Sequence, residues 1–347
     1  MSIASQLTAL EGNISNAYDM VAQRGGTVPA RKNMENLDDA IATIPSGGGG
    51  VGIPREVSDS GVYQMPSSNF TFRLPSNVVD LGEYALAYAF YNDSKLTSVD
   101  LSSLTALNKE HSAYYAFAFC SGLTSADLGS LTTVSRNCLR YAFSNCQNLA
   151  TVDLSSLATL SGADAMANAF YGCRSLTNVD LSSLTTLSGT NAMYSCFTGC
   201  SGLTTVDLSN LTTVSGQGGL QQAFGQCSSL TSVDLSSLAT ASGVNALANL
   251  FYGCTSLTSF TFDSLSVVTG TSAFTYAFRG CTALTSVSFP ALTADSFGTR
   301  TDQFNSMLKS CTGVTVHFPA ALQSTIGSWT SVQNGFGGTN TTVLFDL

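Results

Sequence analysis

The chain has 347 residues and a formal net charge of −9, from 13 Lys and Arg against 22 Asp and Glu. Hydrophobic residues make up 44% of it and charged residues only 10%, so it can bury a large core but has no basic footprint for nucleic acid. No apolar run approaches the roughly 18 residues of a membrane helix, and the N-terminus lacks the features of a secretory signal, so we expect neither nucleic acid nor membrane as partners.

Residues 1–45 are predicted to form a short helical module. Gly25 and Gly26 end a first helix, and a second is expected from about Met34 to Ile44 with Asn33 as its N-cap. Apolar residues of the first helix recur at alternating intervals of four and three, which is a heptad seam: Ile3, Leu7, Leu10, Ile14, Ala17 and Val21. The seam predicts a homo-oligomer, with a trimer favoured. The alternative is a helical hairpin that caps the next domain.

Residues 46–69 are predicted to be a linker and lead-in. The linker begins with SGGGG at Ser46–Gly50, a composition typical of a flexible tether. A tether of four glycines argues against the cap, which would have to dock rigidly on the domain that follows.

Residues 70–318 are predicted to be a solenoid of about ten coils of 27 residues each. Near-copies of LTSVDLSSL recur from Leu96 onward, at intervals of 26 to 29 residues. In the coil that contains Leu176, the strand period of two places Val179 and Leu181 inside, with Asn178 and Asp180 outside. One coil cannot bury its own apolar face, so stacked coils must share a continuous core. Residues 319–347 are predicted to cap the stack, with Trp329 covering its end.

Two resemblances follow from these motifs. The alternation of CxSLTSVDL with AFxGC over residues 70–318 is similar to the BspA-like leucine-rich repeats of bacterial surface proteins and some phage proteins. This implies a β-rich α/β solenoid. The segment GGTVPARKNMENLDDAIATIP, from Gly25 to Pro45, resembles short N-terminal modules of tailed-phage structural proteins. This implies attachment to other virion proteins.

Ten cysteines raise the question of disulfides or zinc. Cys138 and Cys196 stand where other coils carry Ala. The other eight occupy one column, one thiol per coil, and are predicted to be free core thiols: Cys120, Cys146, Cys173, Cys200, Cys227, Cys254, Cys281 and Cys311. Small buried residues give this pattern, and free thiols suit assembly in a reducing cytoplasm. We therefore expect no metal at the cysteines.

An aspartate column is the most chemical feature of the repeat. Six carboxylates face outward at about 5 Å spacing: Asp100, Asp127, Asp153, Asp180, Asp207 and Asp234. Adjacent carboxylates repel by only ~0.8 kcal/mol in water, so a solvated, hydrogen-bonded acidic stripe is favoured. Calcium bridging is the alternative, although no calcium-loop motif occurs. A glycosidase is disfavoured because identical, solvated carboxylates lack the two environments that separate acid from base.

Two further features of the coils are a recurring glycine, predicted to be structural, and a variable segment, predicted to bind a partner. Glycines that follow Ser or Thr once per coil are predicted to be turn residues that need permissive backbone angles: Gly162, Gly189, Gly216, Gly243 and Gly270. The segments between these glycines and the Ala-Phe pair vary from coil to coil, and variation where stacking does not fix the residue favours recognition. Candidate binding residues there are Tyr194, Gln221 and Tyr276, with the aspartate column as the competing surface.

The sequence therefore favours a non-enzymatic phage virion protein without a cofactor, assembled in the host cytoplasm. The N-terminal module would attach it to the particle, and the solenoid would bind a host-surface protein or polysaccharide. The alternatives are a cell-encoded BspA-like adhesin, which would need export, a passive decoration of the head, and an enzyme acting on surface polysaccharide. Because His111 and His317 belong to opposite ends of the repeat, they cannot share a catalytic constellation.

Overall fold

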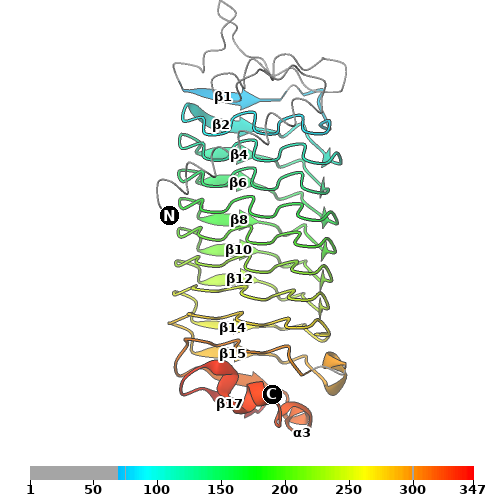
Figure 1. Ribbon diagram of the computed structural model, residues 1–347, viewed down its shortest axis with the longest axis vertical. Helices are drawn as coiled ribbons and strands as arrows, with labels where there is room; N and C mark the ends of the chain where they lie inside the picture. Colours follow the sequence, from blue (N-terminus) through cyan, green and yellow to red (C-terminus); the bar gives the residue numbers. More distant parts are fainter. Residues whose placement is uncertain (1–68, 75, 299–300) are drawn as a thin grey trace, which may run out of the picture. The chain divides into compact units, whose positions relative to one another are not determined.

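The structure is a computed structural model that describes residues 69–74, 76–298 and 301–347. Residues 69–347 form one compact unit, a solenoid whose coils stack along one axis (Figure 1). This confirms the predicted solenoid of about ten 27-residue coils. The heptad seam from Ile3 to Val21 lies outside the described residues, so the helical module, the oligomer and the trimer stay predictions.

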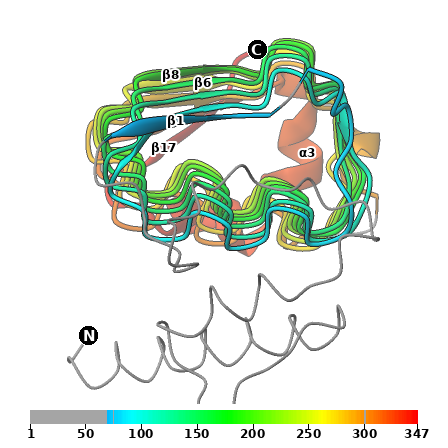
Figure 2. The same ribbon diagram turned by 90° about the horizontal axis from the view of Figure 1, so that it is seen from above.

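One long side of each coil is a strand of parallel sheet, which we call the sheet face (Figure 2). Strands pair in register with the next coil, so that Asp180 lies beside Asp207. The pairing order is β1-β2-β4-β6, then β8-β10-β12, then β14-β15-β16-β17. The strands are β1 (Phe70–Arg73), β2 (Leu96–Asp100), β4 (Ser125–Asp127), β6 (Thr151–Asp153), β8 (Asn178–Asp180), β10 (Thr205–Asp207), β12 (Ser232–Asp234), β14 (Ser259–Thr261), β15 (Ser286–Ser288), β16 (Thr315–Phe318) and β17 (Thr342–Phe345).

A second, narrower parallel sheet follows the first around the coil. Its six two-residue strands are β3 (Ala106–Leu107), β5 (Thr133–Val134), β7 (Thr159–Leu160), β9 (Thr186–Leu187), β11 (Thr213–Val214) and β13 (Thr240–Ala241). Side chains alternate as the strand period predicts: Val179 is 3% exposed and Leu181 fully buried, while Asn178 and Asp180 are exposed.

The side opposite the sheet face is built from consecutive tight turns, and we call it the turn face. Backbone amides there alternate between two acceptors. Ala169 donates to Met166 in its own coil (3.1 Å), and Phe170 donates to Cys196 in the next coil (2.9 Å). Every fourth residue has a positive φ, as at Asp164, Asn168 and Gly172. The turn face comprises residues 82–92, 109–119, 136–145, 163–172, 190–199, 217–226, 244–253, 271–280 and 302–310.

The core between the two faces contains two ladders of identical side chains. One phenylalanine per coil, from Phe90 to Phe278, stacks on the next with ring centroids 5.0 to 6.0 Å apart. Each of the eight column thiols donates to the carbonyl oxygen of the phenylalanine one coil earlier, with S···O distances of 2.9 to 3.1 Å. All ten cysteines are free and buried. The thiol column is therefore a hydrogen-bonded part of the stack.

The once-per-coil glycines correct a prediction. None of the five glycines has a positive φ: Gly162, Gly189, Gly216, Gly243 and Gly270. Instead, a Cβ added at Gly216 would overlap the carbonyl oxygen of Gly189 in the preceding coil, and the same holds along the column. Neighbouring backbones approach too closely for any side chain, so these glycines serve close packing. Positive φ falls mainly to Asn, Tyr, Ser and Gln on the turn face.

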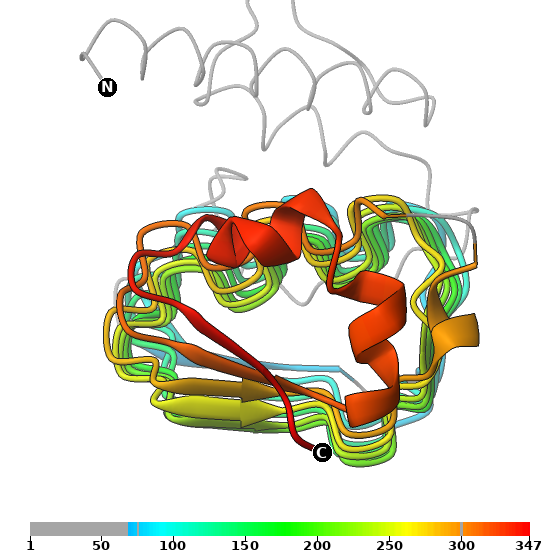
Figure 3. The ribbon, with the colours of Figure 1, turned by 90° about the horizontal axis from the view of Figure 1, so that it is seen from below.

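The C-terminal segment adds a further strand as well as short helices. β17 continues the sheet in parallel register with β16, pairing His317 with Leu344. Leu322, Ile326 and Phe336 are fully buried there. Trp329 lies edge-on to Phe297 (5.0 Å) and is only half-buried. The helices that lie across the end of the stack (Figure 3) are η2 (Ala320–Leu322), α3 (Gln323–Ile326), α4 (Thr330–Gln333) and η3 (Gly335–Gly337). Another short helix, η1 (Ala294–Phe297), lies between β15 and β16 at the side of the stack.

The glycine column predicts a steep cost for the smallest side chain. Gly216→Ala should lower the free energy of unfolding by about 2–3 kcal/mol, because two backbones must move apart. Gly313→Ala is the control, since Gly313 has φ +73° and no atom within 4 Å of an added Cβ; it should cost only about 1 kcal/mol of backbone strain. Urea denaturation of the two variants checks this. Equal costs of the two substitutions would contradict the close-packing role of the glycine column.

The buried thiols predict a steep loss of stability in alkali. Burial raises the pKa of Cys227 to about 12 and that of Cys138 to about 11. Seven further thiols also have raised pKa values: Cys120, Cys173, Cys196, Cys200, Cys254, Cys281 and Cys311. Since the folded pKa values are raised, the stabilisation is complete below the unfolded pKa of about 8.5 and is lost as pH rises above it.

One unit above the unfolded pKa, each thiol costs about 1.4 kcal/mol, and nine together roughly match a typical free energy of unfolding. The Tm, measured by circular dichroism, should therefore fall steeply between about pH 9 and 10. The control is Cys196→Ala, because Ala precedes the core phenylalanine in several other coils. The free energy of unfolding of this variant should depend less steeply on pH, because one proton fewer is released on unfolding. Constant stability from pH 8 to 10 would contradict the raised thiol pKa values.

Candidate functional site on two faces of the solenoid

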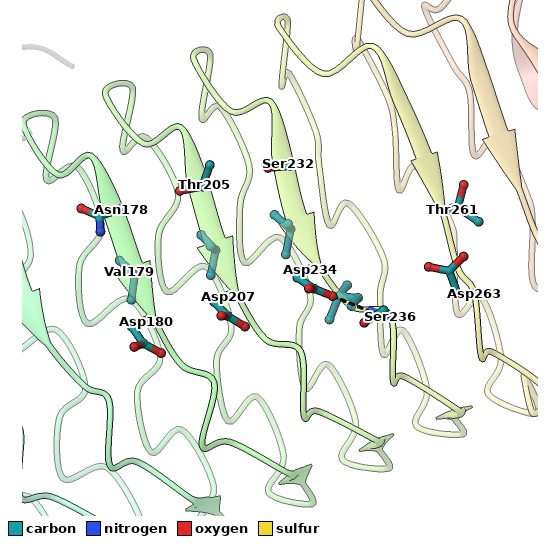
Figure 4. A pocket seen from close by; sticks show the side chains of 13 residues that line it. Asn178, Val179, Asp180, Thr205, Asp207, Ser232, Asp234, Ser236, Thr261 and Asp263 are labelled. Atoms are coloured by element: carbon teal, nitrogen blue, oxygen red, sulfur yellow. Dashed lines mark hydrogen bonds between the residues drawn. The ribbon is translucent and has the colours of Figure 1, made fainter.

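The sheet face carries two shallow hollows, of about 690 and 620 Å³. Both are lined by the outward side chains of successive strands. One extends from β8 to the segment after β14, and the other from β1 to β8. In the first, Asn178 and Thr205 form one row and Asp180, Asp207 and Asp234 a parallel row (Figure 4). The predicted aspartate column therefore lines both hollows.

Each aspartate of the column has a structural task. Its Oδ1 accepts a hydrogen bond from the backbone amide two residues later, at 2.9 to 3.1 Å in all six coils. This bond turns the chain away from the strand and satisfies an amide that the sheet does not use. At Asp100, hydrogen bonding from Ser102 and the nearby guanidinium of Arg73 (2.7 Å) hold the carboxyl pKa below its usual value. The column thus recurs because every coil needs the same turn.

The possible metal ligands and the two histidines do not converge on one site in the described residues. Among residues 69–74, 76–298 and 301–347, no three His, Cys, Asp or Glu side chains are grouped so as to hold a metal ion. Within the same residues, no helix has the length and apolarity to cross a membrane. His317 contacts Asp346 through Nδ1 (2.9 Å) at the C-terminal end. His111 stacks on Tyr84 in the first coils, where burial lowers its pKa. The two histidines thus serve separate local contacts.

The three candidate residues of the turn face do not form one cluster. Tyr194 and Gln221 occupy the same column in adjacent coils, because the amides of Asn168 and Ser195 donate to their carbonyls (2.8 and 3.0 Å). Tyr276 lies one position further along its coil, in the positive-φ column, and two coils beyond Gln221. All three side chains are half-exposed. The candidate surface is therefore a strip along the turn face.

A tyrosine cluster on the first coils was missed by sequence reasoning. Tyr88, Tyr115 and Tyr141 stack ring on ring in successive coils, with centroids 5.1 and 4.5 Å apart. Tyr114 lies edge-on to Tyr115 (4.7 Å). Phe119, which lies edge-on to Tyr91 (5.4 Å), is 40% exposed. Burial raises the phenol pKa of Tyr88 and Tyr115. The two adjacent tyrosines in NKEHSAYYAF indicate an aromatic surface. The column of stacked rings can be recognised only after the coils are aligned at their positive-φ residues.

The fold defines a leucine-rich repeat solenoid, the class of protein expected from the repeat. The family profile described as the BspA type leucine rich repeat region matches residues 65–155, 115–249 and 220–323. The chain therefore belongs to the BspA-type leucine-rich repeat family. Solenoids of this class bind or support other molecules more typically than they catalyse reactions.

The chain is similar to solved structures of other leucine-rich repeat proteins. A leucine-rich repeat protein from Bacteroides ovatus is 17% identical over 81% of this chain and 97% of that one, with a TM-score of 0.32. A leucine-rich cell surface protein from Faecalibacterium prausnitzii is 18% identical over 79% and 78%, with a TM-score of 0.25. No curated protein sequence matches the chain. The family assignment rests on the repeat profile.

The turn role of the aspartates predicts which substitutions matter. Asp180→Ala with Asp207→Ala should cost about 1 kcal/mol per lost hydrogen bond in urea denaturation. Asp180→Asn with Asp207→Asn should cost less, because the amide oxygen still accepts the bond. The same measurements with calcium and with chelator test the metal alternative. A calcium-dependent rise in Tm in the native chain, absent from the Asn variant, would replace the turn interpretation with a metal-bridged face.

Proposed function

We propose that this chain is a non-enzymatic phage virion protein, attached by its N-terminal module, whose solenoid binds a host-surface protein or polysaccharide. The observation that carries the binding role is the contrast between the faces. Sheet-face side chains repeat from coil to coil, and the aspartates among them accept the hydrogen bonds that form the turns of their own coils. Aromatic and cationic side chains on the turn face, in contrast, differ between coils. A face that stacking does not constrain is available for recognition.

Attachment to a particle is supported by the N-terminal sequence. GGTVPARKNMENLDDAIATIP has the likeness to tailed-phage structural proteins, and the heptad seam supplies an oligomerisation surface. The proposed location is the virion, in the tail, the baseplate or another part of the particle surface. Virion proteins are then the partners of residues 1–45.

The second candidate function is a cell-encoded adhesin. It is favoured by the match to the BspA-type leucine-rich repeat family. Purified particles discriminate the two. A virion protein is present in them at fixed stoichiometry, whereas an adhesin is found on the surface of the producing cell.

The binding role is tested with the full chain on host cells. Tyr194→Ala with Gln221→Ala should weaken adsorption without a large change in Tm, because both side chains lie outside the core ladders. Asp180→Asn with Asp207→Asn tests the competing surface on the opposite face, and a loss of adsorption in this variant alone would move the binding role to the aspartate column. A chain without residues 1–50 should still bind cells but fail to enter particles. If neither face affects adsorption, the solenoid is a passive spacer or decoration and the proposed binding role is wrong.

A further inference from the structure

Two cations and two tyrosines gather on the turn face near the C-terminal end of the solenoid. Tyr252, Arg279 and Lys309 take the same position in three successive coils. The backbone amide after Tyr252 donates to the carbonyl of Arg279 (2.8 Å), and the amide after Arg279 donates to the carbonyl of Lys309 (3.0 Å). The Arg279 guanidinium lies 5.2 Å from the ring centre of Tyr252 and 5.6 Å from that of Tyr276. Lys309 Nζ lies 5.5 Å from the Tyr276 ring centre. We call these four residues the cation–tyrosine patch.

Within residues 69–74, 76–298 and 301–347, neither cation of the patch has an anionic partner. In the described part of the chain, Arg279 and Lys309 form no ion pair with a carboxylate. Elsewhere on the turn face the same motif is complete: Arg140 lies over Tyr141 (5.6 Å) and also pairs with Asp164 (3.4 Å). The patch therefore has the arginine and the ring of that motif but lacks its carboxylate.

The two cations also break the pattern of their own column. Positions equivalent to Arg279 in earlier coils are all uncharged: Tyr91, Ala118, Ser144, Tyr171, Thr198, Gly225 and Tyr252. Coils repeat at about 4.8 Å, so the two like charges repel by roughly 0.8 kcal/mol in water, as in the aspartate column, and an anion between them would turn this weak repulsion into attraction. The tyrosine rings hold both cations in place by cation–π contact. This arrangement prepares a site for a negative group supplied from outside.

The spacing of the coils favours a saccharide over a peptide. A coil-to-coil distance of about 4.8 Å is similar to the length of one pyranose unit, so a polysaccharide along the axis meets successive coils with successive sugars. An extended peptide advances about 3.3 Å per residue and falls out of step. Arg also binds planar carboxylates in bidentate fashion, and tyrosine beside it offers a ring face to a sugar.

We propose that the cation–tyrosine patch binds a carboxylated saccharide, such as a uronate or sialate unit of a surface glycan. The carboxylate would lie between Arg279 and Lys309, and the sugar ring beside Tyr252 and Tyr276. This names the ligand class for host-surface binding and so rests on the proposed function. No bond is made or broken.

The test uses purified full-length protein and defined ligands, without cells. Galacturonate, glucuronate and sialate oligosaccharides are titrated by isothermal calorimetry, each beside its methyl ester, which keeps the sugar and removes the charge. At least one acid should bind, weaken with added salt, and lose affinity at least tenfold on esterification. If none of the acids binds, or if an ester binds as tightly as its acid, the proposal is overturned.

Single substitutions test whether the saccharide binds at the cation–tyrosine patch. Arg279→Thr introduces the residue that Thr198 supplies in this column, and Tyr276→Asn introduces the residue that Asn249 supplies at the same positive φ. Each should weaken binding at least tenfold with little change in Tm, as should Lys309→Gln. The control, Arg140→Gln, changes net charge equally at the completed motif and should alter affinity less than twofold. Equal losses in Arg140→Gln and Arg279→Thr would overturn the site.

Two further outcomes separate this inference from the proposed function. An oligoglutamate of equal charge that binds as tightly as the saccharide would show a site for acidic peptide and overturn the saccharide. Cells that bind the native chain and the Arg279→Thr variant equally would overturn the patch, while the proposed host-surface role would stand. Saccharide binding together with absence from purified particles would support the patch and contradict only the virion role.

Discussion

Every residue of this solenoid must be compatible with its own equivalent one coil away. Parallel, in-register stacking places like beside like about every 4.8 Å, and the repeated columns show how that constraint is met. Glycine allows two backbones to touch, as at Gly189 and Gly216. Each column thiol donates to a carbonyl of the neighbouring coil, and core phenylalanines stack face to face. Each coil then needs only its neighbours, which is why so regular a sequence folds without long-range contacts between distant coils.

The same constraint explains how much the sequence could predict. A column appears in the sequence as a period, so the solenoid, the inward Val179 and Leu181 and the burial of the thiols all follow from spacing alone. The reason for a column is harder to find, because it lies in the neighbouring coil. The glycines looked like turn residues in one coil, yet the backbone of the preceding coil explains them. Strand β17 lacks the LxxVDL pattern, so its pairing with β16 was not predicted either.

The candidate site was predicted in part for a related reason. The aspartates were located by their period, but their turn hydrogen bonds depend on local backbone geometry that spacing does not contain. Tyr276 was grouped with Tyr194 because both precede the Ala-Phe or Cys-Phe pair, although positive φ places them in different columns. The ring stack of Tyr88, Tyr115 and Tyr141 needed an alignment at the positive-φ residues.

Recognition on such a scaffold can be local because the coils are nearly independent. A column position on the turn face accepts Ala118, Tyr171, Thr198 or Arg279 without a change in the backbone ladder around it. Exchanging one of these residues alters the surface of a single coil and leaves the two core ladders intact. Buried columns have no such freedom, because a substituted core side chain must still pack against the equivalent side chains of the coils on both sides. Within the described residues, Arg279 and Lys309 depart from a column that is otherwise uncharged and share their tyrosines without a carboxylate, and this combination favours an external partner over a role in folding.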